Sequence, residues 1–224
     1  MSFQCEFCSK TFAKESTVVS HMCEAKRRRM EQHERGVQLG LNAYLQFYRN
    51  MNRSGRTRTF DDFAASPYYK AFVKFGRYCV DIRAVNPARL IDWLLKNQKR
   101  IDNWCSDRLY SDYLVDLLQC EAVSDALIRS IESSVEWGER NGYPPHDWLR
   151  YGNRSALCHS MVTGKLSPWA VYCSESGQAL LNDLDSQQLT MIWPYIDSDR
   201  WQKILTDSGG DRAYATEILK QAGW

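Results

Sequence analysis

The chain has 224 residues and a formal net charge of +2, and 44% of its residues are hydrophobic and 25% charged. These values indicate a globular protein with a buried core and exclude a disordered tail. No apolar run approaches the roughly 20 residues that a membrane-spanning helix needs, and the opening residues do not resemble a signal peptide. We therefore expect a cytoplasmic protein that has no membrane partner.

Charge and cysteine are both distributed unevenly along the chain. Residues 1–58 contain eleven Lys or Arg against five Glu, a net charge of +6, whereas the remainder has 18 basic and 22 acidic residues. A basic end of this kind favours a polyanionic partner. Three of the eight cysteines lie within the first 23 residues and the other five are scattered singly. This pattern indicates a metal site in a reducing compartment, with the isolated cysteines as small core residues.

The first expected element is a zinc finger over residues 1–25. Cys5 and Cys8 are separated by two residues, and twelve residues separate Cys8 from His21, which is the spacing of a Cys2His2-type finger. The cofactor predicted from this pattern is Zn²⁺. A segment of about 20 residues cannot hold a fold without such a metal.

Apolar residues stand at the offsets that a ββα finger requires for its small core. Phe3 lies two residues before the first cysteine, Phe12 lies four residues after the second, and Val18 lies three residues before His21. Agreement at six fixed positions makes a fortuitous pair of cysteines the weaker interpretation.

The fourth ligand is open between Cys23 and His33. Three to five residues usually separate a second histidine from the first, but Ala25, Lys26 and Arg27 occupy those positions. Cys23 is nearest, although two residues turn a regular helix by about 200° and would place it on the wrong face. If Cys23 is the ligand, the helix must end or tighten at His21.

Base contacts from the finger are expected to be weak. Counting back from the histidine, the positions that face bases in typical fingers are Lys14, Thr17 and Ser20. None is an arginine, and two are small polar residues. The alternative is that the finger binds another protein.

A basic helix over about residues 24–50 follows, and then a basic loop over residues 50–59. Their arginines and lysines are suited to phosphate contacts, which give affinity without sequence choice and depend steeply on salt. Charge reversal at Arg27 and Arg28 is expected to weaken binding uniformly across sequences. The alternative is that these basic residues form a solvated helix end and contact no nucleic acid. The candidate contacts in this part are Lys26, Arg27, Arg28, Arg29, Arg53, Arg56 and Arg58.

Further helices are expected through the rest of the chain. Asp61 and Asp62 suit the start of one helix after Thr59, and Ser66-Pro67 predicts the start of the next. Asn86-Pro87 predicts the start of another helix, and later helices are expected at about 106–120, 122–139, 153–163, 168–174, 176–183, 186–193, 197–206 and 211–222. The fold class is thus mainly α: a ββα finger over 1–25, then a basic and aromatic helical part over 26–105 and a helical part over 106–224.

The segment 68–80 alternates aromatic and basic residues. One interpretation is a platform on which unpaired bases stack. The other is a core stripe at helical spacing, formed by Tyr68, Phe72, Phe75 and Cys79. We expect Phe72 and Phe75 in the core. The basic residues here that could contact phosphates are Lys70, Lys74 and Arg77.

Nothing in the sequence predicts an enzyme. It has no glycine-rich phosphate loop, no His-Glu metalloprotease pair and no nucleophile elbow. His146 and His159 are isolated, and the acidic residues near helix boundaries are better explained as caps.

From residue 66 onward the chain resembles the helicase-loading (helicase-assembly) proteins of T4-like phages. The resemblance lies in PYYKAFVKFGRY (67–78), in the segments 90–104 and 108–119, and in the C-terminal pattern of 155–173 and 200–222. It implies a two-domain helical protein that binds forked or single-stranded DNA and contacts a single-strand-binding protein. It further implies that the protein places a replicative helicase and has no catalytic site. The zinc finger departs from the family pattern.

The first functional hypothesis is therefore a phage replication accessory protein that loads the replicative helicase. The second is a phage regulatory protein whose finger binds duplex DNA or a component of the transcription machinery. An enzyme with an unrecognised site, such as a nuclease, is the third.

Overall fold

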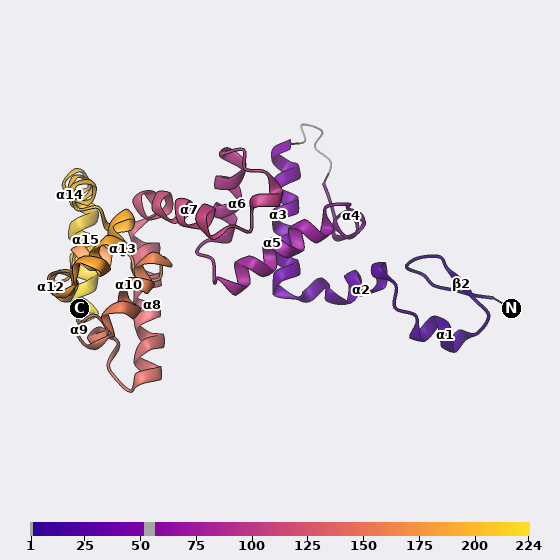
Figure 1. Cartoon of the computed structure of the whole chain (residues 1–224), viewed down its shortest axis with the longest axis horizontal. Coiled ribbons are helices and arrows are strands. Elements are labelled where there is room, and N and C mark those ends of the chain that lie inside the picture. The colour runs from indigo at the N-terminus through magenta and orange to yellow at the C-terminus, as the bar shows by residue number, and fades with distance from the viewer. Residues whose placement is uncertain (1, 52–56) are drawn as a thin grey trace. The chain divides into compact units, whose positions relative to one another are not determined.

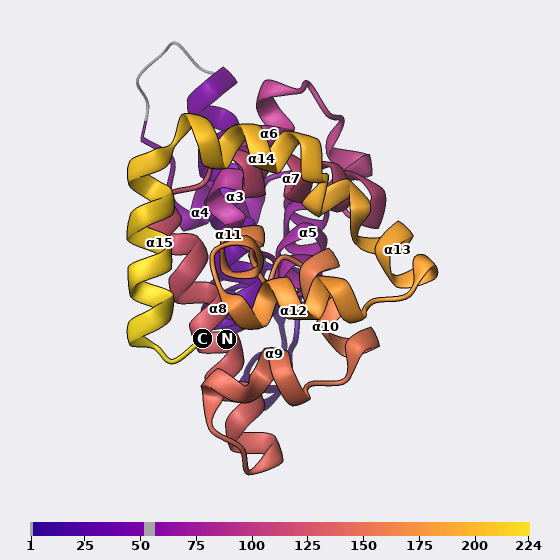
Figure 2. The same cartoon turned by 90° about the vertical axis from the view of Figure 1, so that its left-hand side faces the viewer.

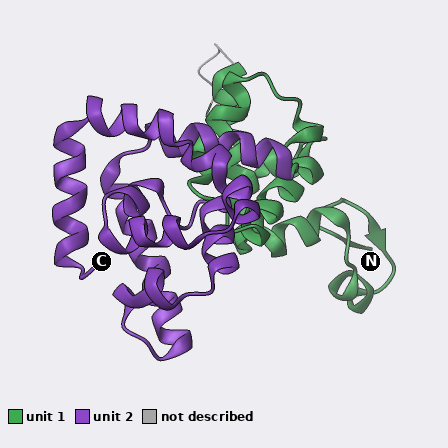
Figure 3. Cartoon of the chain, turned by 60° about the vertical axis from the view of Figure 1, so that its left-hand side comes forward, with its two compact units in different colours: residues 1–106 green, residues 107–224 purple. Residues whose placement is uncertain are grey.

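The computed structural model describes residues 2–51 and 57–224. In these residues a small two-stranded sheet at the N-terminal end is followed by helices only (Figure 1 and Figure 2). The expected class, a ββα finger followed by a helical body, is confirmed. The chain divides into two compact units, residues 1–106 (unit 1) and residues 107–224 (unit 2) (Figure 3).

The finger consists of strands β1 (Phe3–Gln4) and β2 (Thr11–Phe12) and helix α1 (Glu15–Ser20). The strands are antiparallel, and Phe3 pairs with Phe12. These two residues and Val18 are only half-buried. The apolar core of the finger is therefore too small to stabilise the segment alone, as expected for a fold that depends on a metal.

The single helix expected over residues 24–50 is wrong: the segment forms α2 (Glu24–Met30), the 3-10 turn η1 (Glu31–His33) and α3 (Arg35–Met51). Glu34 is extended, with φ −62° and ψ 135°, and it ends the helical run. Tertiary contacts explain the break, because α2 turns to pack on α4 (Phe60–Ala65).

Helices α3 and α5 (Tyr69–Asp81) form the centre of unit 1 and pack with their backbones almost in contact (Figure 1). Three glycines make this approach possible. A Cβ on Gly76 would lie 2.0 Å from the carbonyl oxygen of Gly36, and a Cβ on Gly40 would lie 2.7 Å from that of Phe72. No larger side chain fits at this crossing.

Helix α5 begins later than the Ser66-Pro67 pair predicts. Ser66 is the C-cap of α4, and its hydroxyl accepts the backbone N–H of Tyr68. Tyr68 is consequently outside the helix and 52% exposed, so its placement in the core stripe is wrong. Tyr69 takes that place, and the expected core positions Phe72 and Phe75 are buried.

Other local expectations for unit 1 are met. Thr59 and Asp62 form a capping box at the start of α4. Unit 1 is completed by α6 (Pro87–Lys96) and η2 (Ile101–Asn103). Trp104 is 1% exposed among the rings of Phe72 and Phe75, and its indole N–H donates to the Lys99 carbonyl.

Unit 2 is a cluster of short helices around α8 (Val123–Asn141), as Figure 2 shows. Most of its helices begin at a side-chain cap, such as Asn153, Ser174 or Asp185. Among the described residues no helix is long and apolar enough to cross a lipid bilayer. The elements are α7 (Asp107–Cys120), α8 (Val123–Asn141), η3 (Pro145–Asp147), α9 (Trp148–Tyr151), α10 (Arg154–Val162), α11 (Pro168–Tyr172), α12 (Glu175–Asp183), α13 (Ser186–Ile196), α14 (Ser198–Asp207) and α15 (Gly209–Gln221).

Candidate metal centre

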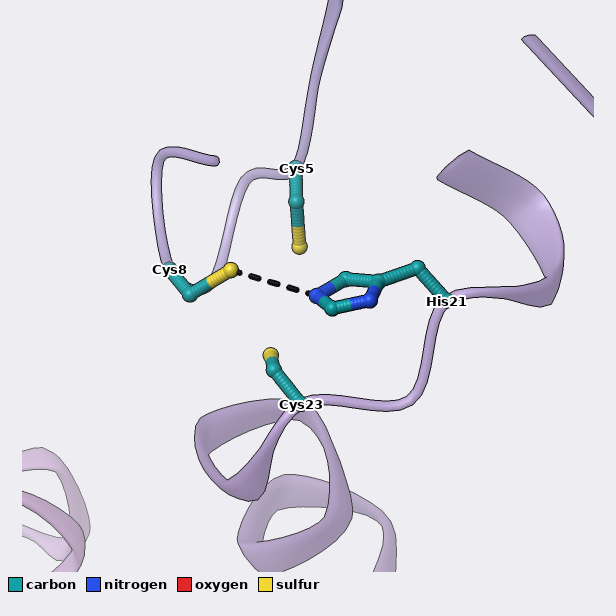
Figure 4. Close-up of side chains that lie close together, drawn as sticks. All are labelled: Cys5, Cys8, His21 and Cys23. Atoms are coloured by element: carbon teal, nitrogen blue, oxygen red, sulfur yellow. Dashed lines mark hydrogen bonds between the residues drawn. The ribbon is translucent and has the colours of Figure 1, made fainter. Parts of the chain in front are cut away.

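Cys5 and Cys8 lie on a tight turn that follows β1. The Cys5 N–H donates to the Lys10 carbonyl at 2.9 Å, and the Ser9 N–H donates to the Cys5 carbonyl at 2.9 Å. Ser9 has φ 58°, in the left-handed region that closes such turns. The turn carries both sulfur atoms to the same side of the loop (Figure 4).

His21 stands where α1 ends. Its backbone is extended, with φ −65° and ψ 121°, and its N–H still bonds the Val18 carbonyl. The ring of Phe12 lies 4.7 Å from the imidazole, centroid to centroid, and restricts its rotation. The Nε2 atom of His21 is thereby directed at Cys8, whose sulfur is 3.3 Å away (Figure 4).

Cys23 is the N-cap of α2. Because α1 ends at Ser20 and the chain is extended at His21, Cys23 turns back toward the imidazole, as the His-x-Cys spacing requires. Its sulfur also accepts the Lys26 N–H at 3.4 Å. His33, the alternative fourth ligand, lies exposed in η1 beside Gln32 and outside this cluster.

The four side chains form a group that could hold a metal ion. The ligand atoms of Cys5, Cys8, His21 and Cys23 all lie within 4.8 Å of one another (Figure 4). Cys5 is 4% exposed and lies deepest. Four protein ligands leave no position for a substrate, which is typical of a structural metal site rather than a catalytic one.

The thiols respond differently to this environment. The Phe7 backbone N–H is the largest cause that lowers the pKa of Cys5. The pKa of Cys8 is raised: the Lys10 backbone N–H lowers it, but burial and the neighbouring thiols of Cys5 and Cys23 outweigh that effect. Crowded thiolates repel one another, and a bound cation reverses this effect.

The three finger residues predicted to face bases are all exposed on α1. Lys14 is the N-cap, and Thr17 follows one turn later. The Ser20 hydroxyl donates to the carbonyls of Ser16 and Thr17. Of the three residues, Lys14 and Thr17 are therefore the more available for contact with a ligand.

Most of the basic cluster on α2 has partners inside unit 1. The Lys26 ammonium donates to the carbonyls of Val19 and His21, at 3.1 and 3.3 Å. Arg28 is only 17% exposed at its side chain, pairs with Glu24 at 2.6 Å and also bonds the Ala64 carbonyl. These residues hold α2 in place instead of projecting freely.

Two further predicted phosphate contacts, Arg29 and Arg58, also have partners within the protein. Arg29 pairs with Asp61. Arg58 donates to the Tyr44 hydroxyl at 3.0 Å and stacks 3.9 Å from the centre of the Tyr48 ring. Arg53 and Arg56 lie outside the described residues.

On α5 the basic residues lie along one exposed edge. Arg77 pairs with Glu34 at 2.9 Å and with Glu31 at 3.4 Å, and Glu34 is the largest cause that raises the pKa of Arg77. Lys70 is 3.6 Å from Glu24, with a side chain that is 80% exposed. Lys74 is exposed and makes no ion pair among the described residues.

Side chains of α2 and α5 enclose a surface groove of about 690 Å³, which we call the α2–α5 groove. Residues of α2 and α5 are about 40 positions apart in the sequence, so neither this groove nor the place of Tyr69 in it could be predicted from local patterns. The only signal in the sequence was the shared basic character of the two segments. The groove is lined by Glu24, Arg27, Arg28, Glu31, Tyr69, Lys70, Val73, Lys74, Arg77, Tyr78, Asp81 and Cys105.

Comparison with known protein families, with curated proteins and with solved structures finds no match to this chain. A functional interpretation must therefore come from the residues of the two sites themselves.

Proposed function

We propose that this chain is a zinc-binding, non-catalytic protein that binds DNA through its phosphates. The observation that carries the proposal is the double role of Cys23. This residue belongs to the metal-binding cluster and is also the N-cap of α2, the helix that contains Lys26 to Arg29. A metal held at Cys23 would therefore determine where the basic helix begins and which way its side chains project.

Zinc is the metal that best suits the donor set. Three thiolates and one imidazole are soft and borderline ligands, and four of them satisfy the tetrahedral geometry that structural zinc prefers. With Zn–S bonds of about 2.3 Å, the ligand atoms of such a tetrahedron lie about 3.8 Å apart. The present separations of up to 4.8 Å would need to contract only slightly.

DNA is the proposed partner because the exposed charge of unit 1 is basic and lies beside the finger. Arg27, Lys70 and Lys74 are exposed, and they come from two helices that face one groove. The exposed polar side chains of Lys14 and Thr17 on α1 add little sequence choice. Binding is thus expected to depend on phosphate contacts and to show weak sequence preference.

The biological setting that we favour is replication. The resemblance of residues 66–224 to helicase-loading proteins supports forked or single-stranded DNA as the ligand, with a replicative helicase and a single-strand-binding protein as partners. The alternative is a regulatory protein that binds duplex DNA or a component of the transcription machinery. It is favoured by one observation, the finger itself, since fingers commonly dock on duplexes.

A binding comparison tests the proposal. The zinc-loaded full chain would be titrated by fluorescence anisotropy with forked, single-stranded and blunt duplex DNA of matched length. The same series would be repeated after chelation. We expect fork and single strand to bind more tightly than duplex, with an affinity that falls as salt rises and after chelation. Preference for one duplex sequence would support the regulatory alternative. No binding at low salt would refute the proposal and leave only the form of the alternative in which the chain binds a protein.

A further inference from the structure

The cationic side chains that line the α2–α5 groove outnumber its acidic side chains. Five of its lining residues are cationic and three are acidic: Arg27, Arg28, Lys70, Lys74 and Arg77, against Glu24, Glu31 and Asp81. Glu24 is shared between Arg28 and Lys70, and Arg77 pairs with Glu31 and with Glu34, which is not part of the lining. Arg27 and Lys74 have no ion pair among the described residues. The groove therefore keeps an unbalanced positive field that favours an anion.

A buried hydroxyl in the same groove points independently to a ligand. Tyr69 is 5% exposed, and its hydroxyl has no hydrogen-bond partner among the described residues. The Nε atom of Arg28, whose guanidinium lies 4.4 Å from the centre of the Tyr69 ring, is also buried without a partner. A buried donor without an acceptor costs about 1–3 kcal/mol, so a molecule that brings an acceptor to it is stabilised there.

The missing partner must be an acceptor. The Nε–H group of Arg28 can only donate and the hydroxyl of Tyr69 can donate as well, so an acceptor oxygen is the partner that satisfies both. An anionic oxygen bonded by both groups and surrounded by cations fits these requirements. The Tyr69 ring is itself buried against Arg28 and Phe63 and cannot stack on a base, so the groove would contact a nucleic-acid strand through its phosphates.

We propose that the α2–α5 groove is the site at which unit 1 holds the phosphodiester backbone of single-stranded DNA, with one phosphate bonded to the Tyr69 hydroxyl. This inference rests on the proposed DNA-binding function and assigns it to a place other than the finger. Arg27 and Lys74 supply long-range attraction along the groove. Lys70 gives up part of its interaction with Glu24 to contact a neighbouring phosphate.

The test removes one oxygen atom. Tyr69→Phe keeps the ring and its contact with Arg28 but deletes the unpartnered hydroxyl. We expect its melting temperature to equal or exceed that of the parent, whereas its affinity for an oligothymidylate of about 16 nucleotides falls about tenfold. The matched control is Tyr68→Phe, on the neighbouring exposed ring, which should bind as the parent does.

Charge variants examine the same groove without altering its packing. Arg27→Gln and Lys74→Gln should each weaken binding of the single strand several-fold. Each should also lower the slope of log affinity against log salt concentration by about one counterion. Lys96→Gln, on the exposed end of α6, is the control for loss of one positive charge and should change neither quantity to that extent. Anisotropy measured at several salt concentrations provides both numbers.

The outcomes separate the groove from the wider function. If the parent binds the strand and Tyr69→Phe binds equally well, the groove is not the site, while DNA binding stands. If the parent binds no DNA at low salt, both proposals are refuted. Polyglutamate that displaces the strand at equal charge concentration would show an acidic-peptide site and would also overturn the groove assignment.

Discussion

The backbone N–H of Lys26 donates to the sulfur of Cys23 at 3.4 Å, and the ammonium of Lys26 reaches back to the carbonyl of His21. The first turn of the basic helix is therefore bonded both to a candidate metal ligand and to the end of the finger helix. Loss of the ligand should disturb the helix, and loss of the helix start should disturb the ligand.

Replacing Cys23 tests the metal centre. Cys23→Ser should lower zinc stoichiometry or affinity, because the hydroxyl is a poorer zinc ligand than a thiolate. The finger and the start of α2 should lose protection from amide exchange. His33→Asn is the control, since His33 lies outside the cluster. Zinc content by a chelator dye and hydrogen exchange by mass spectrometry would measure both effects. Full zinc retention in Cys23→Ser would contradict the assignment.

Arg27 and Arg28 should behave differently although they are adjacent. Arg28→Glu should destabilise unit 1, because it removes the bonds to Glu24 and Ala64 and places a carboxylate against Glu24. Arg27→Glu should leave the melting temperature nearly unchanged and weaken DNA binding uniformly across sequences. Calorimetry together with anisotropy separates the two roles. Equal loss of stability in both variants would contradict this distinction.

The crossing of α3 and α5 should not tolerate a methyl group. Gly76→Ala should lower the free energy of unfolding by about 3 kcal/mol or more, since its Cβ would lie 2.0 Å from the Gly36 carbonyl oxygen. Gly210→Ala on α15 is the matched control, because nothing lies within 4 Å of its Cβ. That change should be neutral or stabilise by up to about 1 kcal/mol. Urea denaturation measures both, and a neutral Gly76→Ala would show that the helices are farther apart.

Unit 2 contains a buried ion pair that should be sensitive to truncation. Arg129 forms two bonds of 2.7 Å to Glu121, whose side chain is only 4% exposed. Arg129→Met should cost about 3–5 kcal/mol, because it leaves a buried carboxylate without a partner. Arg140→Met, which breaks the exposed pair with Glu136, should cost no more than about 0.5 kcal/mol. Similar losses in the two variants would rule out this difference in burial.

Alkaline pH should destabilise the protein partly through Cys79. Burial raises the pKa of this thiol from 9.0 to about 12, so the folded state favours the neutral form. Its stabilising contribution is complete below about pH 9 and is lost as the pH rises toward about 12. Cys79→Ala should therefore show a shallower decline of unfolding free energy in that range, with an unchanged slope between about pH 6 and 8. Denaturation at a series of pH values checks this, and parallel curves throughout would contradict it.

Local chemistry made the finger and most helices predictable. Cys5, Cys8 and His21 have a spacing that few other structures require, and capping residues such as Asp185 mark where helices begin. These signals depend on neighbours within a few residues, so the sequence alone determines them. The break between α2 and α3 was missed because the interactions that favour it come from α4, more than 30 residues away in the chain.

The amino-acid sequence by itself determined a helical protein with a candidate metal site in an N-terminal finger and a basic end. Only the tertiary structure decided which cations remain available, since Arg28 and Arg29 are bonded to Ala64 and Asp61 of α4 while Arg27 stays exposed. It also brought Tyr69 beside Arg28 without an acceptor for its hydroxyl. The physical reason is that ion pairs and buried donors depend on side chains from different helices, whose meeting is set by packing and not by spacing along the chain.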